Sequence, residues 1–419
     1  MITAILRVTP ACPFLNWMNP ELARLQPYPF QKLADLIAGV MPPADRKPIR
    51  LSVGEPQHPS PQIVLDEISR QLKGLSSYPS TRGLDALSAA IADWCNRRFH
   101  LTRAPLDPGR HVLPACGTRE ALFSIVAAVL DRRRHARPVV IMPNPFYQIY
   151  EGATFLAGAE PYFLNTVADN NYRMDWESVP EEIWSRTQLV FTCSPGNPTG
   201  AVLSRDDYAR LIERAGRHDF VIAADECYSE IYFDETHPPP GLLQIAHDAG
   251  IKDYRRCVVF HSLSKRSNLP GLRSGFIAGD GELMQAYLQY RTYQGCTVSS
   301  LAQAGSIVAW RDEAHVRENR EQYRAKFDAV LDVLAGTFDV RKPEAGFYLW
   351  PGVGMDDETF ARELFRREHV LVLPGSYLSR DAHGLNPGRN RVRMALVAPL
   401  AECVEAARRV RRFVETQSG

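Results

Sequence analysis

Apolar residues along this chain follow two patterns, one helical and one of short uninterrupted runs. Between residues 85 and 99, side chains such as Leu87, Ile91 and Trp94 recur at helical spacing and predict a helix. From residue 112, apolar and β-branched runs alternate with helical stretches such as 121–130 and 206–217. The runs span residues 112–113, 139–142, 189–192, 220–224, 257–261 and 276–278. Because they lack polar alternation, they indicate a mostly parallel, doubly wound sheet that is covered on both faces.

The first sixty residues contain weaker signals. Asn19 followed by Pro20 is typical of a capped helix start, and Leu33 and Ile37 belong to a later helical stripe. Residues 51–56, Leu-Ser-Val-Gly-Glu-Pro, predict a short strand that ends in a turn.

The pattern changes after about residue 300. A long amphipathic helix is predicted over 314–334, and a closing helix over 401–414. Between them, residues 347–350, 370–373 and 391–396 predict a small sheet. The predicted fold is therefore α/β, with a large domain over 61–300 and a smaller α+β domain over 301–419. Residues 1–60 are expected to be an N-terminal segment that joins the small domain.

Composition describes an ordinary globular protein and excludes some partners. Hydrophobic residues make up 45% of the 419 residues, charged residues 23%, and the formal net charge is +1. A balanced charge gives no electrostatic support for nucleic acid or an acidic membrane as a partner. The apolar stretch 1–6 is broken by Arg7, and no later run reaches membrane-spanning length. We therefore expect a cytoplasmic protein.

Cysteine and histidine are spaced unlike metal ligands. The eight cysteines include no C-x-x-C pair, and the eleven histidines include no H-x-x-x-H. Cys116, Cys193 and Cys257 fall in or beside apolar runs, which favours buried, reduced thiols. No metal is expected.

Lys265 is the leading chemical candidate. The chain has seven lysines, none between Lys73 and Lys252, and Lys265 stands between hydroxyl residues in Ser-Leu-Ser-Lys-Arg-Ser. A lysine amine can bond the carbonyl carbon of a phosphorylated aldehyde, while Ser262, Ser264 and the permanently charged Arg273 hold its phosphate. This combination describes pyridoxal 5'-phosphate (PLP), which also needs a carboxylate at its ring nitrogen.

Other polar residues follow predicted strands, where ligands of open α/β sheets bind. Asp225 comes directly after an apolar strand and is costly to bury unless it is paired, although it could instead cap a helix. Asn197 lies in a rigid Pro- and Gly-rich loop, and its amide and the Tyr228 hydroxyl can both donate to the ring oxygen. Thr118 follows a glycine at a helix start, which suits an anion but is as often only a tight turn.

Nearly the whole chain resembles the fold type I PLP-dependent aminotransferases of classes I and II. The segments that carry this resemblance are Ser52-Val-Gly-Glu-Pro56, Tyr78 with Gly83-Leu84, Gly117, Asn144-Pro-Phe-Tyr147, Asn197-Pro-Thr-Gly200, Asp225 with Tyr228, Ser262-Leu-Ser-Lys265, Arg273 and Arg391-Val-Arg393. The Ser-Leu-Ser-Lys segment with Arg273 is the most specific of them.

The resemblance implies a role for each matched residue. Lys265 would bind the cofactor covalently, Asp225 would pair with its ring nitrogen, and Asn197 and Tyr228 would hold its ring oxygen, with Tyr147 stacked on the ring. The implied phosphate ligands are Thr118, Arg119 through its backbone, Ser262 and Arg273, with Tyr78 reaching in from a neighbouring subunit. Arg393 would bind the substrate α-carboxylate, helped by the Gly54 backbone and by Asn197. A homodimer with shared active sites is also implied.

A closer likeness is to the bacterial N-succinyldiaminopimelate aminotransferases. It rests on Gln26-Pro-Tyr-Pro-Phe30, Tyr78-Pro-Ser-Thr-Arg-Gly83, Asn144 to Glu151, Asp225 to Phe233 and Ser264 to Asn268. It implies transfer of an amino group between N-succinyl-LL-2,6-diaminopimelate and 2-oxoglutarate by a ping-pong mechanism, in diaminopimelate and lysine biosynthesis. Arg82, Tyr28 and Tyr293 are candidates for binding the distal end of such a substrate.

Three other interpretations stay open. The scaffold could serve another amino acid, of aspartate, aromatic, alanine or acetylornithine type, or a PLP-dependent C–S lyase or small-ring synthase. A PLP-sensing transcription regulator would need a basic winged-helix domain, and the residues before Ser52 have no Lys/Arg stripe. A nonenzymatic scaffold would leave Lys265, Asp225 and Arg273 unexplained.

Overall fold

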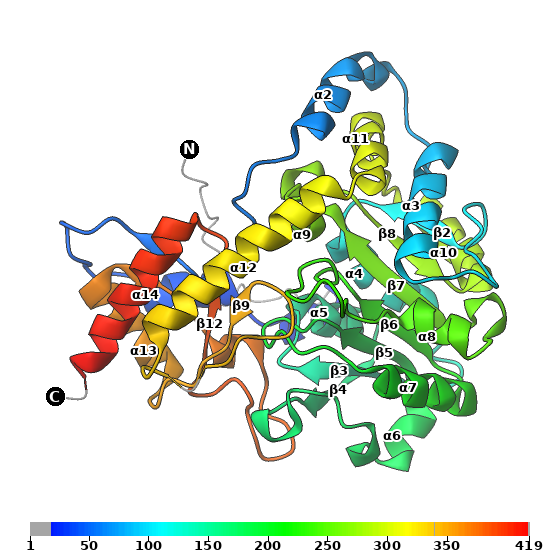
Figure 1. The fold of residues 1–419 in the computed structure, drawn as a ribbon. Coiled ribbons are helices and arrows are strands. Elements are labelled where there is room, and N and C mark those ends of the chain that lie inside the picture. The colour runs from blue at the N-terminus through cyan, green and yellow to red at the C-terminus, as the bar shows by residue number, and fades with distance from the viewer. Residues whose placement is uncertain (1–17, 339, 418–419) are drawn as a thin grey trace.

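A seven-stranded sheet forms the centre of the larger part of the computed structural model, which describes residues 18–338 and 340–417 (Figure 1). In spatial order its strands are β2 (Val112–Ala115), β8 (Gly275–Gly279), β7 (Cys257–Ser262), β6 (Val221–Asp225), β5 (Thr187–Cys193), β3 (Val139–Asn144) and β4 (Glu160–Asn165). β8 runs antiparallel to both neighbours, and every other pair is parallel. The predicted α/β fold with a mostly parallel sheet is confirmed.

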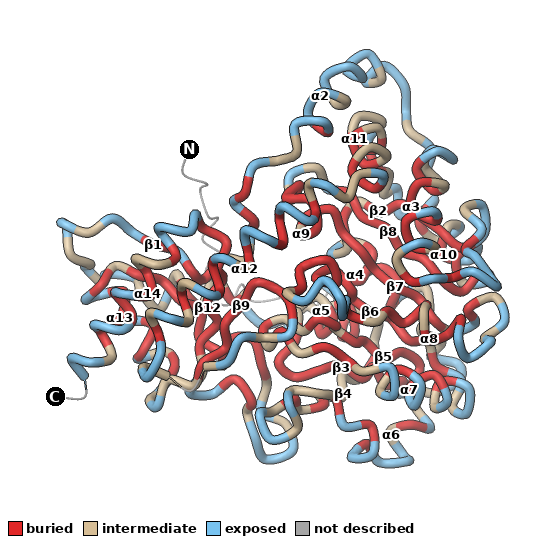
Figure 2. The backbone as a smooth tube through the Cα atoms, viewed as in Figure 1, coloured by how far each residue is buried: buried red, intermediate tan, exposed pale blue. Residues whose placement is uncertain are grey.

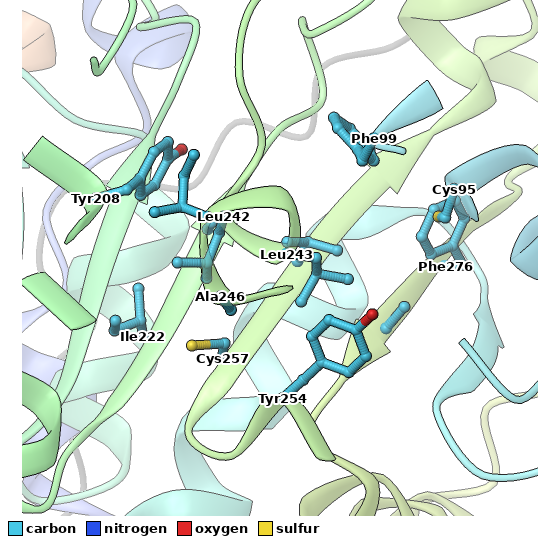
Figure 3. Close-up of a cluster of buried hydrophobic side chains, with 14 of the residues drawn as sticks. Cys95, Phe99, Tyr208, Ile222, Leu242, Leu243, Ala246, Tyr254, Cys257 and Phe276 are labelled. Carbon is cyan, nitrogen blue, oxygen red and sulfur yellow. The ribbon is translucent and has the colours of Figure 1, made fainter. Parts of the chain in front are cut away.

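Helices cover both faces of this sheet because successive side chains of each strand point to opposite sides. In β6, Ile222 packs into one core cluster and Ala223 into another. One face is covered by α3 (Asp85–Arg98), α6 (Glu181–Arg186), α7 (Arg205–His218), α8 (Leu242–Asp248) and α11 (Ser300–Arg311), and the other by α4 (Thr118–Val129), α5 (Gln148–Leu156) and α10 (Gly281–Gln294). Figure 3 shows Leu242 and Ala246 of α8 in the first cluster, near Ile222 and Cys257. Figure 2 shows that the strands other than the edge strand β4 are buried along most of their length.

A second core lies beside the sheet. β1 (Ile49–Arg50) pairs in parallel with β10 (Val370–Leu371), and β11 (Leu373–Pro374), β12 (Val392–Ala395) and β9 (Tyr348–Leu349) form an antiparallel sheet. These strands pack with α13 (Asp357–Glu368) and α14 (Leu400–Glu415). The long helix α12 (Ala314–Leu334), labelled in Figure 1, contributes Phe327, Val330 and Leu334 to this core.

Shorter elements connect these units. The remaining α-helices are α1 (Pro29–Leu36), α2 (Gln62–Arg70) and α9 (Leu263–Arg266). The 3-10 helices are η1 (Pro20–Arg24), η2 (Leu72–Ser76), η3 (Ala168–Asn170), η4 (Trp176–Ser178), η5 (Lys252–Tyr254), η6 (Pro270–Leu272) and η7 (Gly375–Leu378). As predicted, Asn19 caps η1, and its side chain accepts from the Glu21 N–H at 3.0 Å.

Two predicted strands are wrong in detail. Residues 51–56 are not a strand: β1 ends at Arg50, and the carbonyls of Ser52 and Gly54 accept from side chains rather than from a neighbouring strand. Residues 370–373 belong to two short strands rather than one, because the two halves of this segment have different partners. β10 pairs with β1, and β11 pairs with β12. β4 was not predicted; it is an edge strand that contains Pro161 and two polar ends, so its apolar pattern is weak.

The predicted domain boundaries at residues 60 and 300 stay a prediction. Ala309 and Trp310 of α11 pack in the core of the large sheet, which favours a later boundary than 300. The apolar stretch 1–6 lies outside the described residues.

Candidate active site

A cavity of about 530 Å³ opens beyond the carboxyl ends of β5, β6 and β7. It is bounded by the loop after β1, by the start of α4 and by β12 of the second core. Twelve of the thirteen site residues predicted from the sequence line it: Gly54, Thr118, Arg119, Tyr147, Asn197, Asp225, Tyr228, Ser262, Ser264, Lys265, Arg273 and Arg393. Residues separated by more than 300 positions therefore meet in one space.

Lys265 lies on the short helix α9, which begins directly after β7. The Ser262 hydroxyl caps this helix by accepting from the Ser264 N–H at 3.1 Å. The Lys265 amine donates to the Gly54 carbonyl at 2.6 Å. Burial lowers its pKa to about 8, and the nearby positive charge of Arg393 acts in the same direction. A much larger fraction of this amine than of an exposed lysine is therefore uncharged, and so nucleophilic, near neutral pH.

Asp225 ends β6 and is only 4% exposed. Its carboxylate accepts from the Tyr150 hydroxyl at 2.6 Å and from the Cys227 N–H at 3.2 Å. Burial raises its pKa even so, since neither donor carries a charge. Tyr150 was not predicted as a site residue; it stacks on Phe191 with ring centroids 4.4 Å apart and so holds the carboxylate in place.

Arg393 lies on β12 and lines the cavity. Its guanidinium donates to the Ser52 carbonyl at 2.8 Å and to Asn197 Oδ1 at 3.1 Å, and lies 4.5 Å from the centroid of the Tyr348 ring. The Tyr348 and Tyr228 hydroxyls are 3.0 Å apart. Arg393 Nε has no hydrogen-bond partner among the described residues. The Arg393 guanidinium thus keeps one buried donor that is not used within the described residues.

A glycine is required at position 54, where the loop after β1 passes the Tyr348 hydroxyl. A Cβ at this position would overlap the Tyr348 hydroxyl, so only glycine lets the loop carry its carbonyl to Lys265. Tyr348 was not predicted from the sequence, because its role depends on packing between the second core and this loop.

The turn before α4 forms a narrow cradle. Gly117 has a φ of +81°, and a Cβ there would overlap the Arg273 guanidinium. No side chain caps α4, which leaves the N–H groups at its start to bind an anion. Arg273 donates to the carbonyls of Pro270 at 3.0 Å and Cys116 at 3.3 Å, which fixes it beside the same turn. Thr118 Oγ1 lies 3.0 Å from the Cys227 sulfur.

The Arg119 side chain points away from this cradle. Its Nε donates to the Tyr147 hydroxyl at 2.8 Å, and its Nη2 donates to the Tyr28 hydroxyl at 3.3 Å. Only its backbone can therefore serve the anion site at the start of α4, as the family resemblance implied.

These features fit a phosphorylated pyridine aldehyde. The cradle at Gly117 offers N–H groups and a guanidinium to a dianion, Lys265 offers an amine of lowered pKa, and the buried Asp225 carboxylate needs a cationic partner. All three groups border the same cavity.

Three residues considered from the sequence lie elsewhere. Tyr78 is fully exposed, with a relative exposure of 103%, and Tyr293 is 85% exposed; neither lines the cavity. Arg82 donates to the Gly109 carbonyl, which is the structural use of a turn residue. Of the three distal candidates, only Tyr28 lines the cavity.

Comparison with known proteins decides the family. A family model described as "Aminotransferase class I and II" matches residues 46–410. The chain belongs to this family. An LL-diaminopimelate aminotransferase from Desulforudis audaxviator is 32% identical over 404 residues, which cover 93% of this chain and 96% of that one.

Solved structures agree with this assignment. An aminotransferase from Neisseria meningitidis is 46% identical, with a TM-score of 0.90 over 94% of this chain and 100% of that one. Aminotransferase AspB from Helicobacter pylori is 33% identical, with a TM-score of 0.85 over 93% of this chain and 99% of that one. The chain is thus a PLP-dependent transaminase of fold type I, and the predicted fold, cofactor and enzyme class are confirmed.

The residues that the structure describes contain neither a group of metal ligands nor a membrane-spanning helix. Within 18–338 and 340–417, no three His, Cys, Asp or Glu side chains are grouped so that they could hold a metal ion. Over the same residues, every helix is too short or too polar to cross a bilayer. Cys257 is buried, as predicted, whereas Cys116 and Cys193 are only partly buried.

Proposed function

We propose that this aminotransferase acts on N-succinyl-LL-2,6-diaminopimelate, with 2-oxoglutarate as the amino acceptor, in diaminopimelate and lysine biosynthesis. The transfer itself is supported by one observation: the Lys265 amine, the Asp225 carboxylate and the Arg393 guanidinium line one cavity. The choice of substrate is supported by the motifs of the N-succinyldiaminopimelate aminotransferases and by relatives that are named for a diaminopimelate substrate.

In this proposal the residues around the cradle hold the cofactor. The N–H groups of Thr118 and Arg119, together with Ser262, Ser264 and Arg273, bind its phosphate. Asp225 pairs with its ring nitrogen, Asn197 and Tyr228 bind its ring oxygen, and Tyr147 packs on the ring. Bound PLP supplies an electron-accepting ring that stabilises negative charge on the substrate carbon.

Lys265 and Arg393 act on the substrate. The Arg393 fork, which donates to Asn197 Oδ1, binds and orients the α-carboxylate, helped by the Gly54 backbone and the Asn197 amide. The Lys265 amine, whose pKa is lowered to about 8, would take the proton from the substrate α-carbon onto Nζ and give it up again as the transfer proceeds. Because one amino group is passed between two substrates, ping-pong kinetics are expected.

Free LL-diaminopimelate is the second candidate, because it is the substrate named in the relatives that are 28–32% identical. A half-reaction panel separates the two. PLP-loaded enzyme is mixed singly with N-succinyl-LL-diaminopimelate, LL-diaminopimelate, glutamate, aspartate, phenylalanine, alanine and acetylornithine, and the visible absorbance of the aldehyde form is followed. Faster conversion by the succinylated compound supports the proposal; faster conversion by any other amino acid except the donor glutamate contradicts it.

A C–S lyase on the same scaffold is tested in the same preparation. Cystathionine is added without an acceptor acid, and ammonia and pyruvate are measured. Release of both products, with no amino transfer to 2-oxoglutarate, would overturn the proposed transferase.

We also propose a homodimer in which Tyr78 reaches the phosphate of the neighbouring subunit. Support comes from the segment around η2, where Leu72, Leu75 and Tyr78 are exposed at 57%, 69% and 103%, an arrangement typical of a surface that is covered by a partner. Light scattering should give twice the mass of 47.1 kDa. A monomer that retains full activity would contradict both the dimer and the role of Tyr78.

A further inference from the structure

The short helix that carries Lys265 cannot satisfy its own last carbonyls. α9 has four residues, and the carbonyls at the end of a helix have no partner within it. Among the described residues, no backbone N–H donates to the carbonyl of Lys265 or of Arg266. A single side chain serves both, because the amide nitrogen of Asn319 donates to them at 3.3 and 3.4 Å. Asn319 therefore caps α9 from a distant part of the chain.

The amide of Asn319 is held in one orientation. Its side chain comes from α12, and the residue is 1% exposed. Because the two carbonyls of α9 can only accept, the amide nitrogen must face them and Oδ1 must point the other way. There Oδ1 accepts from Asn268 Nδ2 at 3.0 Å and lies 2.7 Å from His58 Nδ1. Both donor and both acceptor positions of the amide are thus occupied.

The orientation of the His58 ring follows from that of the amide. Since Oδ1 of Asn319 only accepts, Nδ1 of His58 carries a proton, and Nε2 faces the Lys326 amine at 2.6 Å. His58 follows Gly54 in the same loop, and the Gly54 carbonyl accepts from the Lys265 amine. This loop therefore contacts Lys265 twice, once at the amine and once, through Asn319, at the backbone.

A polar residue is an unusual choice for this position if its only task is packing. Leucine has a similar size and could be buried without the cost of removing an amide from water. Asn319 gains by its hydrogen bonds only while every partner stays in place, so it fixes the geometry of α9 closely. The reach of the Lys265 amine depends on that geometry, and a displacement of about 1 Å in a reacting group can slow a reaction by about 10²-fold.

We propose that Asn319 is a positioning residue for transamination, and that its amide, held by His58, fixes the Lys265 backbone where the amine reaches the substrate α-carbon. This inference rests on the proposed function, because it takes Lys265 as the group that moves the proton. Lys326 is not part of the device: His58 Nδ1 can donate to Asn319 whether or not Nε2 has a partner.

Two replacements of similar size test the cap. Asn319→Asp and Asn319→Leu both remove the donation to α9, whereas the aspartate keeps an oxygen towards His58. In both variants we expect kcat per PLP-loaded site to fall about 10- to 100-fold, which is the range for two lost neutral hydrogen bonds. The KM for the amino acid should change little, since Arg393 is untouched.

The deuterium isotope effect separates positioning from a purely structural role. PLP-loaded enzyme is mixed with glutamate or with α-deuterated glutamate, and the loss of the visible absorbance of the aldehyde form is followed in a single turnover. A displaced amine slows the proton transfer itself, so the isotope effect should increase in both Asn319 variants. A residue that only stabilises the fold would lower the melting temperature and leave the isotope effect unchanged. Glu318→Gln, at an exposed position of the same helix, is the control and should change neither rate nor isotope effect.

A pair of His58 variants gives a second, independent test. His58→Asn places an amide where Nδ1 stands and should retain most of the rate, whereas His58→Leu removes the donor and should lower kcat a few-fold with a larger isotope effect. If neither Asn319 variant folds, this pair decides alone. Equal rates in His58→Asn and His58→Leu, or a folded Asn319→Leu with the wild-type rate and isotope effect, would overturn the proposal.

Failure of this inference is distinguishable from failure of the proposed function. If Lys265→Met retains turnover, the role of Lys265 is wrong whatever Asn319 does. If Lys265→Met is inactive while the Asn319 and His58 variants behave like the wild type, only the positioning role is wrong. The substrate selected by the half-reaction panel affects neither conclusion.

Discussion

Lys265 and Lys326 are both withdrawn from water, and burial lowers the pKa of each to about 8. Their surroundings differ. The Lys265 amine donates to Gly54 and faces the active-site cavity, whereas the Lys326 amine contacts His58 Nε2 at 2.6 Å and the Val397 carbonyl at 3.1 Å and does not line that cavity. In the described part of the chain, neither has a carboxylate within 4.0 Å.

A lowered pKa therefore does not distinguish the reactive lysine from the structural one. The two are even joined by hydrogen bonds: His58 Nδ1 is 2.7 Å from Asn319 Oδ1, and the Asn319 amide donates to the Lys265 carbonyl at 3.3 Å. What differs is access to a space in which a ligand can lie. Burial lowers the pKa of both amines to a similar value, but only the Lys265 amine faces a cavity in which a substrate can bind.

The largest expected difference is in turnover. Lys265→Met should remove the cofactor's lysine-dependent visible absorbance and lower transamination by about 10³-fold or more, because the proton-transfer group is lost. Lys326→Met should retain the absorbance and most of the rate, since its amine touches no substrate. Both are measured with glutamate and 2-oxo acids. If a folded Lys326→Met enzyme were as inactive as Lys265→Met, the structural role assigned to Lys326 would be wrong.

A smaller effect is expected from Arg393→Gln. Loss of a charged hydrogen bond to the α-carboxylate should raise the amino-acid KM roughly 10- to 100-fold while PLP affinity is preserved. Steady-state kinetics and PLP titration check this, with Arg133→Gln as the surface control. Weakened PLP binding with an unchanged KM would place Arg393 at the cofactor instead.

The pH dependence of PLP capture separates the two lysines next. The attacking amine must be uncharged, so the capture rate of the apo enzyme should rise with pH and reach half its maximum near pH 8. Because the positive charge of Arg393 helps to lower the Lys265 pKa, Arg393→Gln should move the profile to higher pH. Lys326→Met should not move it. Stopped-flow absorbance gives the profiles, and a shift caused by Lys326→Met alone would contradict this account.

The smallest effect concerns the stability of the apo enzyme. Each amine has a folded-state pKa of about 8 against a model-compound value of 10.5, so between these values the unfolded chain binds more protons. The free energy of unfolding of the wild type should therefore rise with pH in this window relative to Lys265→Met and to Lys326→Met, by about a few kcal/mol at most.

Urea unfolding at pH 7, 9 and 10.5 measures these differences. Bound PLP should abolish the pH-dependent difference for Lys265→Met and preserve it for Lys326→Met. Identical behaviour of the two variants with PLP present would mean that cofactor and Lys265 do not interact.

Much of the site could be predicted because its chemistry is local in sequence. Lys265 with its flanking hydroxyls, and Asp225 at the end of an apolar run, are recognisable without a structure, because strand ends in such sheets converge. The mostly parallel sheet was also predictable, because most of its strands are continuous apolar runs in the sequence.

The unpredicted residues act across long distances in the chain. Tyr150 reaches Asp225 from 75 positions away, and Tyr348 reaches Tyr228 across 120 positions. Each of these unpredicted tyrosines looks like any other partly apolar residue until packing places it beside a charged group of the site, Asp225 or Arg393. The strand predicted over 51–56 was wrong for a related reason, since the carbonyls of Ser52 and Gly54 accept from Arg393 and Lys265 rather than from a neighbouring strand.

The helix α12 has a mechanical consequence. Near its start, Asn319 is bonded to the carbonyls of Lys265 and Arg266, and two turns later Phe327 is embedded in the second core. A rigid rod is thus attached at one end to the backbone of the reactive lysine and at the other to the body that holds Arg393. Any rotation of that second core must therefore either displace the Lys265 backbone or break these hydrogen bonds. Substrate binding by Arg393 and the position of the Lys265 amine are thus mechanically coupled.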